Sequence, residues 1–137
     1  MCTSFKKELF TATHNFAAAG GHTFKFALFM AAATLSEATT VYSTSNESVG
    51  VNYVAGGFTL TNVDPSTSGT VAMATFAANP TWTSATFTAS QALLYNTSSG
   101  NKAVAVLDFG GTQTVTAGDF VVTIPAVTST TALLRLT

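Results

Sequence analysis

Residues 92–109, ALLYNTSSGNKAVAVLDF, carry the clearest structural pattern in this sequence. Two runs in which apolar side chains recur at alternate positions flank a polar Thr-Ser-Ser-Gly-Asn segment, a pattern typical of a β-hairpin. In the second run, Ala103 and Ala105 fall on one face of the strand, while Val104 and Val106 fall on the other. A strand that is apolar on both faces must be covered on both sides, so we expect this hairpin to lie inside a layered β structure.

Gly, Asn, Ser and Pro break the rest of the chain into short runs rich in Val, Thr and Phe. Such spacing is typical of β-sandwiches and barrels, and no segment shows sustained helical periodicity. The sequence therefore predicts an all-β fold, an antiparallel β-sandwich of which a jelly roll is one form, with residues 1–137 as a single domain. The predicted strands cover residues 5–13, 23–30, 39–42, 58–63, 70–76, 83–89, 91–95, 102–109, 119–124 and 132–136.

Two alternatives stay open within this assignment. Residues 5–10 also fit a helical turn, and the alanines of residues 27–35 favour a helix. The Gly110-Gly111 pair predicts a tight turn or a bulge. Residues 43–50 form the most polar loop of the chain, and we expect it to be the most mobile.

The composition is poor in charge. Only 8% of the 137 residues are charged and 47% are hydrophobic, whereas roughly a quarter of an average soluble domain is charged. Thr, Ser, Ala and Gly take the place of the missing ions, so that burying such a surface against another protein removes few ions from water. We therefore expect a subunit of a larger assembly, with a Thr-rich monomer of the secreted kind as the alternative.

The distribution of charge and apolar residues excludes several partners. The net charge is −1 and the basic residues form no stripe, so we expect no nucleic-acid binding. The longest apolar run, residues 26–33, is shorter than the roughly 20 residues of a transmembrane helix, and no secretory signal is apparent, so we expect no membrane partner and assembly in the cytoplasm. Cys2 has no intrachain partner, which fits a reducing compartment, and we expect it in a mobile terminus.

Few residues suggest a metal site or catalysis. His14 and His22 flank an Ala-Ala-Ala-Gly-Gly loop and, with Glu8 and Cys2, offer a ligand set for zinc. Histidines hydrogen-bonded to the backbone are the favoured interpretation. The chain lacks a nucleophile elbow and a phosphate-binding loop, and no nucleophile, base and orienting group can be assembled, so we expect neither an enzyme nor a cofactor.

Two further side chains each have a structural and a functional interpretation. Asp108 interrupts an otherwise apolar strand, where a buried carboxylate would pair with Lys102, Arg135 or backbone amides rather than act in catalysis. Trp82 is suited to stacking on a carbohydrate, but packing in the core is the favoured interpretation.

Segments spread over nearly the whole chain carry a resemblance to a known family. They are SFKKEL at 4–9, HNF at 14–16, TFKFAL at 23–28, ATL at 33–35, TTVY at 39–42, Glu47, NY at 52–53, AGG at 55–57, LT at 60–61, ALLYN at 92–96, AVAVLDFG at 103–110 and ALLRL at 132–136. In these the sequence resembles a widespread family of small structural proteins of tailed bacteriophages. Its members are encoded among virion genes and share no catalytic motif. Residues 50–53, Gly-Val-Asn-Tyr, stand where the family usually has Gly-Thr-Gly-Tyr.

The resemblance and the charge-poor composition together predict a capsid decoration, or cement, protein. It would bind the outer surface of an icosahedral head after assembly in the host cytoplasm, with the major capsid protein and further copies of itself, as a dimer or trimer, as partners. The alternatives are a head–tail or tail component, and a carbohydrate-binding receptor module built around Trp82, Tyr53 and Tyr95. The residues expected to face a partner are Lys6 and Lys7, in a terminal arm over residues 1–10 that docks by strand addition, and Trp82, Thr83, Thr86, Thr112 and Thr114, in neutral strands.

Overall fold

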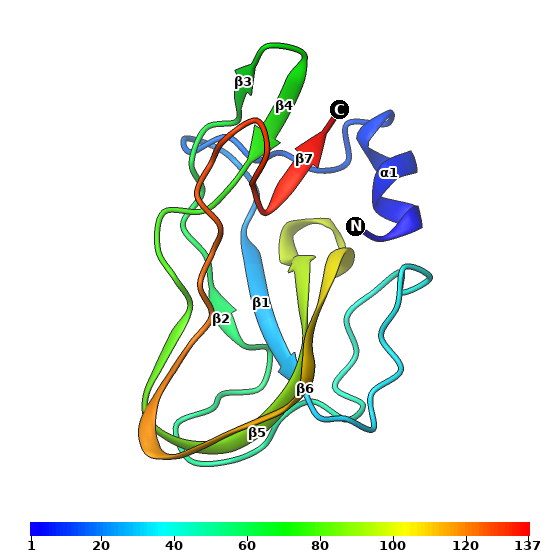
Figure 1. Cartoon of the computed structure of the whole chain (residues 1–137). Helices are drawn as coiled ribbons and strands as arrows, with labels where there is room; N and C mark the ends of the chain where they lie inside the picture. Colours follow the sequence, from blue (N-terminus) through cyan, green and yellow to red (C-terminus); the bar gives the residue numbers. More distant parts are fainter.

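Strands are the main secondary structure of the computed structural model, which describes residues 1–137. The elements are α1 Thr3–Leu9, β1 Phe24–Phe29, β2 Phe58–Thr59, β3 Ser66–Ser68, β4 Val71–Ala74, β5 Thr81–Asn96, the 3₁₀-helix η1 Thr97–Ser99, β6 Lys102–Val121 and β7 Leu134–Leu136. Two antiparallel sheets pack together, one in the order β2-β1-β5-β6 and the other in the order β3-β4-β7 (Figure 1). The predicted all-β sandwich is confirmed.

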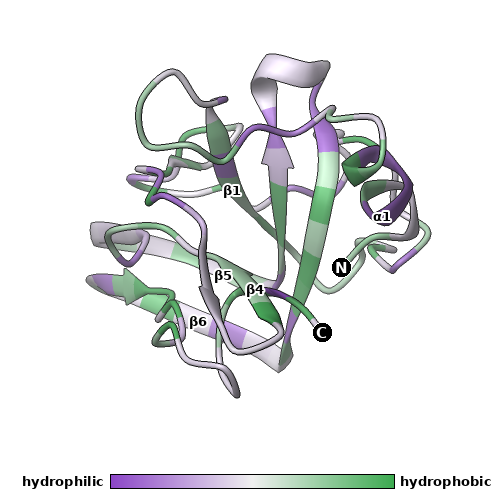
Figure 2. Cartoon of the chain, turned by 90° about the horizontal axis from the view of Figure 1, so that it is seen from above, coloured by the Kyte–Doolittle hydropathy of each residue, from purple (hydrophilic) through white to green (hydrophobic).

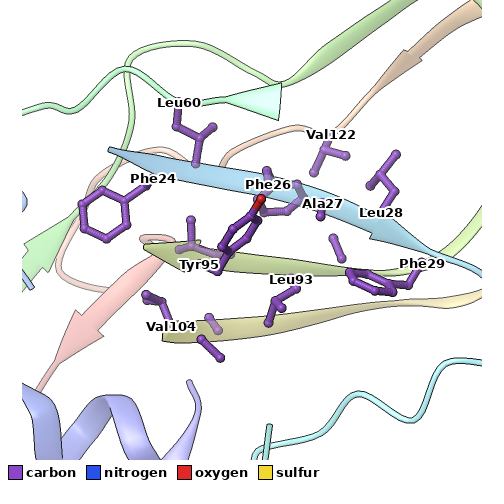
Figure 3. Close-up of a cluster of buried hydrophobic side chains, with 14 of the residues drawn as sticks. Phe24, Phe26, Ala27, Leu28, Phe29, Leu60, Leu93, Tyr95, Val104 and Val122 are labelled. Atoms are coloured by element: carbon purple, nitrogen blue, oxygen red, sulfur yellow. The ribbon is translucent and has the colours of Figure 1, made fainter. Parts of the chain in front are cut away.

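The core is centred on β1 and on the ends of β5 and β6 next to their turn. Figure 3 shows Phe24 and Phe26 of β1 gathered with Leu93 of β5 and Val104 of β6, and all four side chains are fully buried. Neighbouring residues on β6, Val104 and Ala105, are both buried although they point to opposite faces. The expectation that this hairpin is covered on both sides is therefore confirmed.

The predicted turn at residues 96–101 is also confirmed. The Asn96 side chain accepts a hydrogen bond from the Ser98 N–H at 3.0 Å and so caps η1. Gly100 follows with a φ of 67°, a left-handed conformation that glycine adopts without strain.

The strands on either side of this turn are longer than predicted. Runs that the sequence separates, such as 83–89 and 91–95, join into the single strand β5, and β6 continues past Gly110 and Gly111. Ala89 pairs with Gln113 and Gln91 pairs with Asp108, so Ser90 alone opposes residues 109–112. The glycine pair, with φ values of 75° and 149°, therefore forms a bulge, one of the two structures that the sequence allowed.

This bulge divides the hairpin into two parts with different surroundings. We call residues 91–96 and 102–108 the proximal half, and residues 81–89 and 113–121 the distal half. The proximal half pairs with β1, while the distal half curves away from the turn toward the far end of the molecule (Figure 1). A bulge bends the strand that contains it, which accounts for this curvature.

The prediction of a strand over residues 5–13 is wrong, because α1 occupies this segment and ends at Leu9. Cys2, Phe5 and Leu9 recur at helical spacing and place one apolar stripe against the core. Cys2 is fully buried, Phe5 is 2% exposed, and the Cys2 N–H donates to the carbonyl of Val104 at 2.9 Å. The expectations of a mobile Cys2 and of a terminal arm that docks by strand addition are therefore also wrong.

Smaller differences concern short edge segments. Residues 39–42 contribute only an isolated bridge between Val41 and Lys102. Residues 64–69, which lie between two predicted strands, contain β3. The helix considered for residues 27–35 does not form, since β1 continues to Phe29. The one α-helix, seven residues long, is too short to cross a membrane.

Candidate partner-binding surface

The distal half of the hairpin carries a row of exposed threonines on its outer side. Phe87 and Val115 pair across the two strands and are buried, so their side chains point inward. The next pair, Thr88 with Thr114, therefore points outward. We define the threonine face as the outward side chains of this half, of Thr112 next to it and of two valines in the preceding loop. It consists of the exposed residues Thr86, Thr112, Thr114, Thr116, Val49 and Val51 and the half-buried Thr88.

The loop before β2 extends this face beyond β5. Val51 and Thr86 exchange two backbone hydrogen bonds, at 3.0 and 3.1 Å, so the loop runs alongside the strand. Val49 is 78% exposed and Val51 is 59% exposed. A Cβ added to Gly50 would lie 2.0 Å from the carbonyl oxygen of Thr86, which means that only glycine permits this close approach.

Asn52 fixes the end of the same loop. Its φ is 59°, in the left-handed region that asparagine tolerates better than most residues. Its side-chain amide donates to the carbonyls of Thr83 and Ser84 at 3.1 and 3.0 Å. Asparagine therefore suits this left-handed position, and it adds a hydrogen-bonded contact to the distal half.

The threonine face is nearly free of charge. No Asp, Glu, Lys or Arg occurs in residues 48–63, 65–101 or 109–118. Asp119 is the single charged residue of the distal half, and its carboxylate accepts a hydrogen bond from the Ser84 N–H at 3.1 Å. A partner that covers the threonine face removes few charges from water, so the desolvation cost is low.

The structure separates the partner-facing residues expected from the sequence into three groups. Thr83, Thr86 and Thr114 are exposed on the distal half, and Thr112 is exposed at the bulge beside it. Lys6 and Lys7 are exposed on α1, which lies at the other end of the molecule in both views (Figures 1 and 2). The remaining residue, Trp82, is buried, so the expectation that it faces a partner is wrong.

Trp82 belongs to an aromatic cluster on the inner side of the distal half. It is 6% exposed and its ring lies 5.8 Å from Phe58, 6.0 Å from Phe120 and 6.0 Å from Tyr53, measured between centroids. Tyr95, the third member of the carbohydrate platform considered above, is 2% exposed. Core packing, the favoured interpretation of these aromatics, is confirmed.

A buried carboxylate anchors the loop that borders the threonine face. Glu47 is 5% exposed and has no cationic partner, but its oxygens accept hydrogen bonds from the hydroxyls of Tyr42 and Tyr53, at 2.6 and 2.7 Å, and from the Gly56 N–H at 2.7 Å. Tyr95 donates to the carbonyl of Gly56 at 2.8 Å. The expectation that residues 43–50 form a mobile loop is therefore wrong for this part of it.

The surroundings of Glu47 change the chemistry of the tyrosines. Burial, together with the Glu47 carboxylate, raises the pKa of Tyr95 to about 12. The same two causes, in the same order of size, raise the pKa of Tyr42 well above its ordinary value. Burial is also the largest cause at Tyr53, where together with Glu47 it outweighs the hydrogen bond to the Leu28 backbone and raises the pKa well above its ordinary value. Each hydroxyl must stay protonated to serve as a donor, so this network stabilises the loop only while the tyrosines are neutral.

Sequence reasoning missed this network, although it left a signal. Glu47 is the single charged residue in residues 38–63 and stands between Tyr42 and Tyr53. A lone carboxylate in an apolar segment can be buried only where donors are available, and tyrosine hydroxyls are suitable donors.

A second polar network ties α1 to the turn of the hairpin. Glu8 accepts hydrogen bonds from Lys102 at 2.7 Å and from Nε2 of His14 at 2.8 Å. The Asn96 amide nitrogen lies 3.0 Å from Nδ1 of His14 and 3.0 Å from Nδ1 of His22. Since the Asn96 oxygen accepts from the Ser98 N–H, both imidazoles accept at Nδ1, and in their neutral forms they carry the proton on Nε2.

These contacts give the histidines structural partners. The sequence correctly suggested that the loop brings His14 and His22 together near Glu8. Most of their partners are side chains, but Nδ1 of His22 also accepts a hydrogen bond from the backbone N–H of Asn15 at 3.4 Å, which is a partner of the expected kind. No cluster of three or more His, Cys, Asp or Glu side chains forms that could hold a metal ion. Asp108 is exposed and accepts a hydrogen bond from the Gly110 N–H at 2.8 Å, which is the backbone-amide partner that the sequence allowed.

Comparisons with protein-family models, with curated proteins and with solved structures find no match to this chain.

Proposed function

We propose that this chain is a decoration protein of a tailed-bacteriophage head, which binds the outer surface of the assembled shell and stabilises it. The observation that carries the proposal is the threonine face, an exposed and uncharged surface on the distal half of the hairpin. The resemblance to small phage structural proteins supports the same function. The proposed partner is the major capsid protein, and the proposed location is the surface of the virion.

The chemistry of the threonine face suits a partner that is itself a protein surface. Hydroxyl groups can donate and accept, so they adapt to the backbone and side-chain groups of a partner without burying an unpaired charge. Val49 and Val51 add exposed apolar area, which contributes favourable burial. The face is also rigidly held, because Gly50, Asn52 and Glu47 fix the loop against β5 before any partner binds.

Stabilisation would follow from mass action. A protein that binds the assembled shell, and not its dissociated subunits, shifts the equilibrium toward the assembled state. Each individual contact can be modest, because the same contact is repeated at every equivalent position of the shell.

The proposal is tested by measuring where the chain occurs and which surface it uses. Quantitative mass spectrometry of purified particles should find a copy number equal to that of the major capsid protein or a simple fraction of it. Val51→Lys and Thr86→Lys, which place a cation on the threonine face, should bind purified heads more weakly. Val63→Lys, an equally drastic change at an exposed valine outside this face, should bind like the wild type.

The other outcomes separate the competing functions. A few copies per particle at one vertex would indicate a head–tail or tail component. Absence of the chain from purified particles, or head binding that neither lysine variant weakens, would overturn the proposal.

A further inference from the structure

β6 lies at the edge of its sheet, but only its proximal half is covered on the outer edge. There the Val104 carbonyl accepts from the Cys2 N–H at 2.9 Å, and the Ala103 N–H donates to the Thr40 carbonyl at 3.0 Å. The Asn101 carbonyl, just before the strand, accepts from the Tyr42 N–H at 2.8 Å. The distal half of β6 has no neighbouring strand on this side.

The hydrogen-bonding pattern shows which backbone groups point to the free edge. On β5, Thr86 directs both its N–H and its carbonyl to Val51, away from β6. Because these directions alternate along an antiparallel strand, Phe87 faces β6 and Thr88 again faces away. Thr114, the partner of Thr88, is therefore in a pair without hydrogen bonds and directs its N–H and carbonyl to the free edge, as does Thr112 two residues before it.

This edge lacks the features that usually keep edge strands from pairing with other chains. Such edges are commonly protected by lysine, proline or inward-pointing charges. Residues 109–124 contain no Lys, Arg or Pro, and Asp119 is their single charge. Between the bulge at Gly110 and the left-handed residue Ala117, the strand offers an uninterrupted uncharged edge over residues 112–116.

We infer that this edge pairs with the same edge of a second copy, antiparallel and about a two-fold axis at Thr114. Thr114 then faces Thr114 of the second copy in a hydrogen-bonded pair, and Thr112 faces Thr116. Only positions that direct their N–H and carbonyl outward can form such pairs, and this register uses them symmetrically. Cross-strand threonine pairs are themselves favourable.

Charge favours a second copy as the occupant. In this register the paired stretch, residues 112–116, is uncharged on both chains, and the acidic residues Asp108 and Asp119 lie outside it. Each chain offers one free edge of this type, and the two-fold contact occupies it in both copies. The contact therefore produces a closed dimer. The threonine faces of the two copies would then join across the axis into one larger surface. The pairing goes beyond the proposed function and does not depend on it.

The experiment uses a proline that removes only the outward N–H. Thr114→Pro deletes a donor that β5 does not use, so the hairpin should still form. Thr114→Ala is the matched control, because it removes the hydroxyl and keeps the N–H. In sedimentation equilibrium over a concentration series, the wild type and Thr114→Ala should form dimers, while Thr114→Pro should stay monomeric.

Amide hydrogen exchange supplies a second result that needs no variant. The amides of Thr112 and Thr114 should exchange freely at low protein concentration and become protected as the concentration rises. The amides of Gln113 and Val115, which face β5, should be protected throughout. If circular dichroism shows that Thr114→Pro does not fold, the difference in exchange between the outward amides of Thr112 and Thr114 and the inward amides of Gln113 and Val115 tests the inference by itself.

The inference is overturned if the wild type stays monomeric, if Thr114→Pro dimerises like the wild type, or if the Thr114 amide becomes protected only on phage heads. Failure of the proposed function is distinguishable, because it is read from head binding by Val51→Lys and Thr86→Lys, which leave the Thr114 amide in place.

Discussion

The proximal and distal halves of the β5–β6 hairpin have similar alternating sequences but differ in what covers them. In the proximal half both faces are buried, as Leu93 and Leu94 on β5 are each fully buried, and the outer edge of β6 is hydrogen-bonded to the N-terminus and a loop. In the distal half, Phe87 and Val115 cover the inner face, while threonines occupy the outer face and the edge is free. The bulge opposite Ser90 separates the two halves.

This difference assigns separate roles to the two parts of one supersecondary structure. The proximal half, with β1 and α1, holds most of the fully buried side chains and therefore carries much of the stability of the fold. The distal half exposes an unpaired strand edge, threonine side chains and apolar area on its surface. Substitutions should accordingly affect stability in the proximal half and binding in the distal half.

The largest effect on stability should come from the proximal core. Leu93→Ala removes a fully buried side chain and should lower the free energy of unfolding by about 2–5 kcal/mol, because a cavity remains. Thr116→Ala, at an exposed position of the distal half, should change it by only about 0.5 kcal/mol. Urea unfolding followed by circular dichroism measures the free energy of unfolding of both variants. A similar decrease for the two variants would contradict the proposed division of roles.

Substitution of Glu47 should have the second-largest effect on stability, because Glu47 anchors the loop beside the distal half. Glu47→Ala leaves the hydroxyls of Tyr42 and Tyr53 and the Gly56 N–H without their acceptor, and should cost about 1–3 kcal/mol. Glu47→Gln keeps an acceptor oxygen and should cost less. Urea unfolding measures the difference, and a wild-type stability for Glu47→Ala would show that the network does not hold the loop.

The tyrosines allow the same network to be examined without mutation. All three tyrosines of the chain have a raised pKa, that of Tyr95 reaching about 12. A tyrosine whose pKa is raised in the folded state stabilises the fold fully below its ordinary pKa near 10.0. This stabilisation is lost as the pH rises through the folded-state pKa. The ultraviolet absorbance of tyrosinate should therefore appear only together with unfolding. Ionisation of any tyrosine near its ordinary pKa in the folded chain would be incompatible with this.

A smaller effect is expected at acid pH, where Glu8 joins α1 to the proximal half. Burial raises the pKa of Glu8, but the hydrogen bonds and charges of Lys102 and His14 outweigh it and leave the pKa below the ordinary 4.5. The stability from Glu8 is thus present above that ordinary value and is lost as the pH falls through the lowered one.

Glu8→Gln provides the comparison for this acid effect. Its unfolding free energy should fall less steeply than that of the wild type below about pH 5. Reaction of Cys2, the single cysteine and a buried one, with a thiol reagent reports separately on release of the N-terminal segment. Parallel pH profiles for the two proteins would show that the Glu8 contacts contribute nothing.

The sequence predicted the hairpin turn and its buried flanks well, because both depend on local patterns. Alternating apolar residues around Asn96 and Gly100 define the strands and the turn without reference to the rest of the chain. The short N-terminal helix was harder to foresee, because Phe5 and Leu9 fit helix and strand alike until the core that they cover is known.

The surface was only partly predictable, because bulges change which face a residue occupies. Each extra residue reverses the alternation, so the sequence placed Trp82 with the outward threonines although register shifts turn it inward. The Gly110-Gly111 pair looks like a break between strands but lies inside one. Burial of Glu47 depends on donors from several loop segments, which no local pattern reveals.

Hydrogen exchange of the chain bound to purified heads, compared with the free chain at a concentration where it is monomeric, addresses the division between the two halves directly. Binding through the threonine face should slow exchange in residues 112–116 and 48–52, and leave the turn at residues 97–101 unchanged. Slowed exchange at that turn and in α1, with the distal half unaffected, would contradict binding through the threonine face.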